Sequence, residues 1–179
     1  MFDNDLITAI RTAMIAGEAN AGIPNTPIKQ AFQPVQQGAN NAPTAYLHIV
    51  GHQRVGSVQR SDEWSLLLGR MVHTETQQYA TTIQFSILAA QNPTTPNAKT
   101  AGDIANLMAY ILQNEKTIET LRENDIGIQR ILDVRNPPFT DDRGQNEFSP
   151  NFDSIFTHKQ VIVSETPILE TTEFQVISV

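Results

Sequence analysis

Residues 81–134 decide the fold, because one continuous stretch contains a strand pattern, a turn, a helix pattern and a second strand pattern. The stretch opens with TTIQFSIL at 81–88, where apolar and polar residues alternate as they do in a half-buried strand. A polar turn, QNPTTPN at 91–97, separates it from AKTAGDIANLMAYILQNEKTIETLRE at 98–123. Extended chain returns with IQRILDV at 128–134. The segment therefore predicts a strand–helix–strand unit.

The helix at 98–123 carries the strongest periodic signal in the chain. Its apolar residues recur at spacings of three and four, which places them on one helix face. They are Ile104, Leu107, Met108, Ile111, Leu112, Ile118 and Leu121. Thr100 and Asp103 have the spacing of a capping box, so we expect the helix to begin at 97–100. Gly127 predicts that it ends near Asn124.

Composition narrows the classes of protein that the chain can belong to. A length of 179 residues is enough for a single domain with its own core. The absence of cysteine excludes disulfides, thiolate metal sites and a cysteine nucleophile. No apolar run reaches the roughly 20 residues that span a bilayer, so we expect a soluble protein assembled in the cytoplasm. The net charge of −7, with scattered basic residues, argues against a surface that grips nucleic acid.

The N-terminal third predicts a short helix followed by an extended arm. Apolar residues at four-residue spacing indicate a helix at 4–17, which Gly17 or Gly22 would end. They are Leu6, Ile10 and Met14. Residues 23–43 contain four prolines and many Gln and Asn, a composition typical of extended chain. The arm is either mobile or lies on a neighbouring surface, with Phe32 and Val35 as its apolar anchors.

The stretch after the arm predicts a strand at 44–50 and then a long projecting hairpin at 51–77. We expect the tip of this hairpin near 60–63. Its apolar residues, Trp64 and Leu67 among them, have too little local sequence to build a core of their own. They must form an exposed patch or contact another chain.

The C-terminal third predicts a second protrusion and two closing strands. Residues 136–153 form a long polar loop, which is unusual in a compact domain unless it binds something. Three aromatic residues lie in it without any period: Phe139, Phe148 and Phe152. Strand patterns follow at 156–163 and 168–179. The predicted fold class is α+β: one domain over 1–179, with a mostly antiparallel sheet and two helices packed on one face.

The sequence offers no constellation of catalytic or metal-binding residues. His48 and His52 are four apart but fall in a strand context, where they would not share a face. Asp141 and Asp142 precede Arg143-Gly144 and indicate a solvated turn more simply than a cation site. Phosphate-binding glycine motifs and nucleophile elbows are missing. We therefore expect no enzyme, and no catalytic, cofactor or metal residues. A small-molecule-binding α+β domain with a site under the 136–153 loop remains an alternative.

Several short motifs together resemble the neck and tail-terminator-like proteins of tailed bacteriophages. They are FQP at 32–34, PTAY at 43–46, QYATTIQFS at 78–86, AGD at 101–103 and RNPPF at 135–139. The resemblance covers most of the chain and implies a structural protein of the virion. It implies a homo-oligomeric ring, commonly of six copies, that joins the portal or collar side of the head to the tail and lines the DNA exit channel.

The resemblance also implies the partners of the chain. They are further copies of itself, the neighbouring collar or head-completion proteins, and tail or sheath proteins, with duplex DNA passing through without specific binding. A tail-tube or baseplate subunit is an alternative that sequence does not separate from a ring. The candidate interface residues are the apolar side chains of the three protrusions: Phe32, Val35, Trp64, Leu67, Phe139, Phe148 and Phe152.

Overall fold

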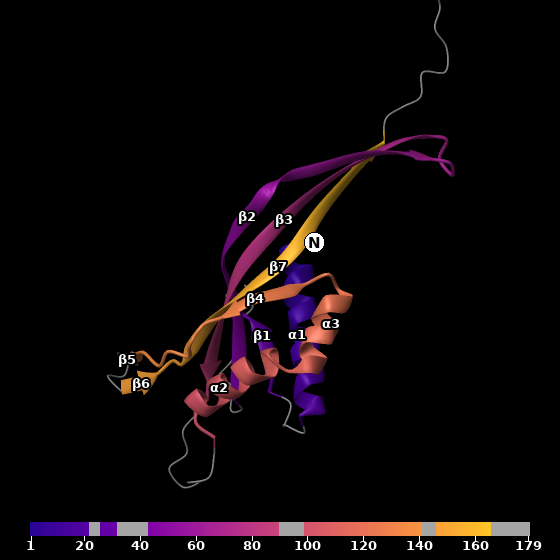
Figure 1. Ribbon diagram of the computed structural model, residues 1–179. Coiled ribbons are helices and arrows are strands. Elements are labelled where there is room, and N and C mark those ends of the chain that lie inside the picture. The colour runs from indigo at the N-terminus through magenta and orange to yellow at the C-terminus, as the bar shows by residue number, and fades with distance from the viewer. Residues whose placement is uncertain (22–25, 32–42, 90–98, 141–145, 166–179) are drawn as a thin grey trace, which may run out of the picture.

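The protein is a five-stranded sheet with three helices on one face (Figure 1). The computed structural model describes residues 1–21, 26–31, 43–89, 99–140 and 146–165. The helices are α1 Asp3–Asn20, α2 Ala101–Leu112 and α3 Glu115–Glu123. The strands are β1 Ile28–Gln30, β2 Thr44–Ser65, β3 Arg70–Leu88, β4 Gly127–Ile131, β5 Pro138–Thr140, β6 Asn146–Phe148 and β7 Asn151–Glu165.

The sheet has the strand order β1-β2-β3-β7-β4, and β5 and β6 form a separate two-stranded pair. β1 runs parallel to β2, whereas the other pairs of neighbours are antiparallel. The α+β class and the mostly antiparallel sheet are thus confirmed. The predicted number of helices is wrong, because the described chain contains three rather than two.

The third helix arises from a break in the predicted helix at 98–123. α2 begins as expected, because Thr100 and Asp103 form a reciprocal capping box: the Asp103 N–H donates to Thr100 Oγ1 at 3.2 Å, and the Thr100 N–H to Asp103 Oδ2 at 2.9 Å. The helix ends at Leu112, and Asn114 caps a new one by accepting the Lys116 N–H at 2.9 Å. An Asn side chain competes with the helix backbone in this way, which explains the break.

α1 continues past Gly17, one of the two glycines that were expected to end it, and ends at Asn20. Gly17 serves a different purpose, since α1 crosses α2 and α3 closely at this position. A Cβ atom added there would lie 2.2 Å from Thr117 Oγ1 and 2.8 Å from Ile111 Cγ2. The glycine therefore permits close packing of the three helices.

Replacing Gly17 with alanine is expected to destabilise the fold by about 1–3 kcal/mol, because the overlap with Thr117 and Ile111 outweighs the better helix propensity of alanine. The matched control is Gly102→Ala in the first turn of α2, where the nearest atom lies 3.8 Å from the added Cβ. Urea unfolding of the two variants measures the difference. A Gly17→Ala protein as stable as the Gly102→Ala protein would contradict the packing role.

β2 and β3 form one hairpin that is longer than predicted. Its turn lies at 66–69, with Gly69 at φ 61°, a conformation that favours glycine. The predicted tip near 60–63 is wrong, because Arg60 pairs with Glu75 and Glu63 with Val72 inside the ladder. Two irregularities in β2, at 49–51 and 55–59, bend the strand along its length.

The two other predicted protrusions each contain short strands. The arm at 23–43 contains β1, in which Ile28 is buried against the core, while residues 22–25 and 32–42 lie outside the described residues. The loop at 136–153 contains β5 and β6, and its last three residues already belong to β7. The predicted strand at 168–179 also lies outside the described residues.

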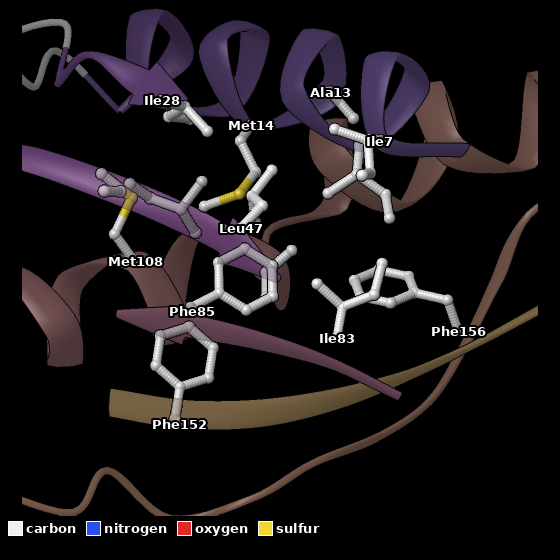
Figure 2. Close-up of a cluster of buried hydrophobic side chains, with 14 of the residues drawn as sticks. Ile7, Ala13, Met14, Ile28, Leu47, Ile83, Phe85, Met108, Phe152 and Phe156 are labelled. Carbon is white, nitrogen blue, oxygen red and sulfur yellow. The ribbon is translucent and has the colours of Figure 1, made fainter. Parts of the chain in front are cut away.

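The core lies between the helices and the lower half of the sheet. Figure 2 shows Phe85, Phe152 and Phe156 of the sheet below Met14 of α1, with Met108 of α2 beside them. The rings of Phe85 and Phe152 stack with centroids 4.7 Å apart. The predicted stripe is confirmed: five of its members are buried, and Leu107 and Ile118 are partly so.

Candidate functional site

The upper parts of β2, β3 and β7 continue well beyond the helices (Figure 1). We call this part, residues 51–65 of β2, the turn at 66–69, residues 70–79 of β3 and 158–165 of β7, the sheet extension. The register keeps the three strands paired to their ends, from His52↔Thr81 to Ser65↔Arg70 and from Tyr79↔His158 to Val72↔Glu165. The extension is therefore an ordered platform without a helix layer of its own.

The most exposed large apolar side chains of the extension lie at two places. At the hairpin turn, Leu66 and Leu67 are 90% and 94% exposed, and Trp64 just before them is more than half exposed. At the end of β7, Val161, Ile162 and Val163 are each at least half exposed. Apolar groups that gather in this way on a projecting element are typical of a protein–protein contact.

Four charged side chains form a network on the face of the extension that continues the helix-covered side of the sheet. Glu75 Oε1 accepts from Arg60 Nε at 2.9 Å and lies 3.4 Å from His73 Nε2. Asp62 Oδ1 lies 2.6 Å from His73 Nδ1. Hydrogen bonds to Asp62 and Glu75 raise the pKa of His73, and hydrogen bonds from His73 and Arg60 lower the pKa of Glu75.

These shifts give the network a pH window. Because the pKa of His73 is raised in the folded state, its contribution to the stability of the fold is fully present below the ordinary value of 6.5. This contribution is lost as pH rises through the raised pKa. The lowered pKa of Glu75 means that its contribution is present above 4.5 and is lost as pH falls through the lowered pKa. Both groups therefore contribute fully to the stability of the fold between pH 4.5 and pH 6.5.

Replacing Asp62 with asparagine is expected to lower the pKa of His73 toward 6.5, because the first hydrogen-bond partner loses its charge. NMR titration of the imidazole measures the pKa directly. The control is Glu63→Gln, since Glu63 lies on the opposite face of β2 and should leave His73 unchanged. An equal pKa in the wild type and the Asp62→Asn variant would contradict the network.

A second polar cluster joins the extension to the core. The buried hydroxyl of Thr81 lies 2.9 Å from both His52 Nδ1 and His158 Nε2, and His52 Nε2 lies 3.5 Å from Asp3 of α1. The N-terminal ammonium donates to the Lys159 carbonyl at 3.0 Å. Burial lowers the pKa of His158, with smaller effects from the ammonium group and His52. The start of α1 is thus held to β2, β3 and β7 through His52, Thr81 and the ammonium group.

The extension has a shallow cavity, but its chemistry does not resemble an active site. The volume is about 170 Å³, below the roughly 300 Å³ at which ligand pockets begin. It is lined by Arg54, Val58, Glu75, Gln77, Tyr79, Gln160 and Ile162. Within the described ranges, no group of three or more His, Cys, Asp or Glu residues could hold a metal ion. In the same ranges, no helix is long and apolar enough to cross a membrane.

The structure places the predicted interface residues in different surroundings. Trp64 and Leu67 are exposed on the extension, as the hairpin prediction requires. Phe139 and Phe148 belong to β5 and β6, but their side chains are not among the described groups. Phe32 and Val35 lie outside the described residues.

Phe152 does not belong with the interface candidates. It is 0% exposed, stacks on Phe85 and pairs with it across β3 and β7. The reason is that β7 begins at Asn151, so that Phe152, Ser154 and Phe156 alternate toward the helices. An aromatic residue assigned to the loop is thus a core residue.

Sequence reasoning missed the exposed apolar group at 161–163. A signal was present, because three consecutive apolar residues in a strand cannot all point to one face. At least one of them had to be exposed. The prediction of a strand at 156–163 was correct in type but did not extend to this conclusion.

An α+β core that carries a long platform with an apolar tip is typical of a subunit that contacts other proteins. Comparison with known protein families identifies such an assembly. The sequence model of the family described as "E217 gateway protein gp29" matches residues 5–168, so the chain belongs to this family of phage gateway proteins. It is a structural component of the phage virion, part of the head-to-tail connector. No curated protein matches the sequence.

Proposed function

We propose that the chain forms a closed ring, most simply of six copies, between the collar side of the head and the tail, and that the ring surrounds the DNA exit channel. The observation that carries the proposal is the sheet extension with its exposed tip at 64–67. Membership of a head-to-tail connector family supports a place between head and tail, and the exposed tip supports a contact with another subunit. Exposed leucines at 90% and 94% are costly for a lone subunit and useful for an assembled one.

The face of the sheet opposite the helices, which we call the open face, fits a channel lining. Because side chains alternate and Ile83, Phe85 and Ile87 point to the helices, the intervening residues of β3 lie on the open face. From 74 to 86 these are Thr74, Thr76, Gln78, Ala80, Thr82, Gln84 and Ser86. This stripe of β3 has no charge, so it lacks the cationic groups that bind phosphates strongly.

Two ion pairs lie at the margins of the open face. Arg70 donates to Glu165 at 2.6 Å, and Arg135 donates to Asp153 at 2.5 Å. Repulsion by acidic groups is therefore a smaller part of the proposed channel than a neutral, hydroxyl- and amide-rich wall. Such a wall lets DNA slide because it neither attracts nor strongly repels the phosphates.

The test is a phage lysate in which the gene for this protein is interrupted. We expect filled heads and complete tails that are not joined, and rescue by the intact gene supplied in trans. Negative-stain images of the purified protein should show rings. Tails of uncontrolled length beside normal heads would instead assign the protein to tail termination, and normal virions would contradict the proposal.

A further inference from the structure

In the described chain, the sheet extension has two strand edges that are unpaired over most of their length. β1 pairs with β2 only up to Gln30↔Leu47, so the outer edge of β2 is open along the extension. β4 pairs with β7 only up to Gly127↔Thr157, and the N-terminal ammonium donates to the Lys159 carbonyl, so residues 160–165 are open on the other side. Open edges present rows of unpaired backbone N–H and C=O groups, and proteins normally protect them or pair them.

The β7 edge lacks the usual protection. Its middle, QVIVS at 160–164, has no charge, no proline and no bulge, and three of its residues are large and exposed. The β2 edge is regular again from Gln59 to Ser65, after the irregularity at 55–59. The two open stretches are thus of nearly equal length. Both carry little net charge, since Arg60 offsets part of the charge of Asp62 and Glu63, and Lys159 offsets Glu165.

We propose that the β7 edge of one copy pairs with the β2 edge of the next, in parallel, and so closes the ring as a continuous β-barrel. The inference rests on the proposed ring. The direction follows from topology: β2 and β7 both run antiparallel to β3, hence parallel to each other. In a ring all copies point the same way along the axis, so only a parallel β7–β2 contact can repeat. Antiparallel pairing of two identical edges would give a two-fold dimer.

The dimensions of such a barrel fit duplex DNA. With three strands from each copy, a strand spacing of about 4.8 Å and a tilt of about 40°, six copies give a backbone diameter of about 36 Å. A side-chain layer of about 5 Å on each side leaves about 26 Å. A DNA duplex is about 20 Å wide. Five copies leave about 20 Å and no clearance, so six is the smallest ring that admits DNA.

The orientation of the barrel follows from the helices. They cover one face of the sheet, and their bulk fits outside a closed barrel rather than within a lumen of this width (Figure 1). The open face, with its uncharged β3 stripe, then lines the channel. Edge pairing therefore accounts for both the closure and the lining with one contact.

Engineered disulfides test the pairing, and the native chain contributes no background because it has no cysteine. One cysteine replaces Ser61 on the open face of β2, and a second replaces Lys159, Val161 or Val163 on the open face of β7, in three separate double variants. Within one copy these positions are two strands apart, since Ser61 pairs with Thr74 and Thr74 with Val163. That separation of about 10 Å exceeds the reach of a disulfide, so any bridge joins two copies.

After oxidation, at least one double variant is expected to give a ladder of covalent oligomers that stops at the ring size, whereas each single variant stays monomeric under denaturing conditions. The matched controls pair Ser61→Cys with Gln160→Cys or Ile162→Cys, which point to the opposite face and should give no ladder. Disulfide-linked dimers of a single-cysteine variant would indicate a two-fold contact between identical edges, and this result would overturn the inference. Rings seen by light scattering without any ladder would overturn edge pairing but leave the ring intact. A protein that light scattering shows to be monomeric would contradict the ring as well.

Discussion

Replacing both Leu66 and Leu67 with serine is expected to leave the subunit folded but to prevent heads and tails from joining. Both side chains are almost fully exposed at the hairpin turn and contribute nothing to the core. Substitutions at such positions usually change the free energy of unfolding by less than about 0.5 kcal/mol. Loss of an apolar anchor in an interface typically costs about 2 kcal/mol or more, and the loss is repeated in every copy of the ring.

The measurement for this variant is complementation of the interrupted gene, scored as infectious particles. We expect a fall of about three orders of magnitude or more, with free heads and free tails in the lysate. The matched control is Tyr110→Ser, which removes an exposed apolar side chain from α2, away from the extension. Normal titres from the Leu66→Ser, Leu67→Ser protein would show that the tip is not a contact.

Replacing Phe152 with alanine is expected to have the largest effect on stability. The side chain is fully buried and stacks on Phe85, so its removal leaves a cavity and should cost about 3–5 kcal/mol. For a chain of this size the melting temperature should fall by about 10 °C. Calorimetry or thermal circular dichroism measures the change.

The control for Phe152 is Trp64→Ala, because Trp64 is a larger aromatic residue that lies exposed on the extension. This variant should melt close to the wild type. The pair separates a core role from an interface role: a Phe152→Ala protein that melts normally but fails to assemble would return Phe152 to the interface candidates.

The fold was predictable where a pattern depends on a few neighbouring residues. The strand at 81–88 and the apolar face of 98–123 follow from local period alone, and the Thr100–Asp103 box fixed the start of α2. The break at Asn114 was missed because the apolar period continues across it. Only the competition of the Asn side chain for a backbone N–H separates α2 from α3.

The candidate site was predictable as a projecting hairpin but not in its detail. Residues 60–63 are polar, a composition that is typical of a turn. They nevertheless lie within β2 and pair with residues of β3. The contribution of β7 depends on pairs that lie far apart in the sequence, such as Val72↔Glu165, and no local pattern contains them. Gly17 was misjudged for the same reason, since Thr117 and Ile111 reach it only in the folded state.

Native mass spectrometry of the intact chain tests the central claim most directly, because a closed ring has one defined mass. The account predicts a single dominant species of about 120 kDa, six times the 19.9 kDa subunit. A monomer at micromolar concentration, or an open series of masses without an end point, would contradict it.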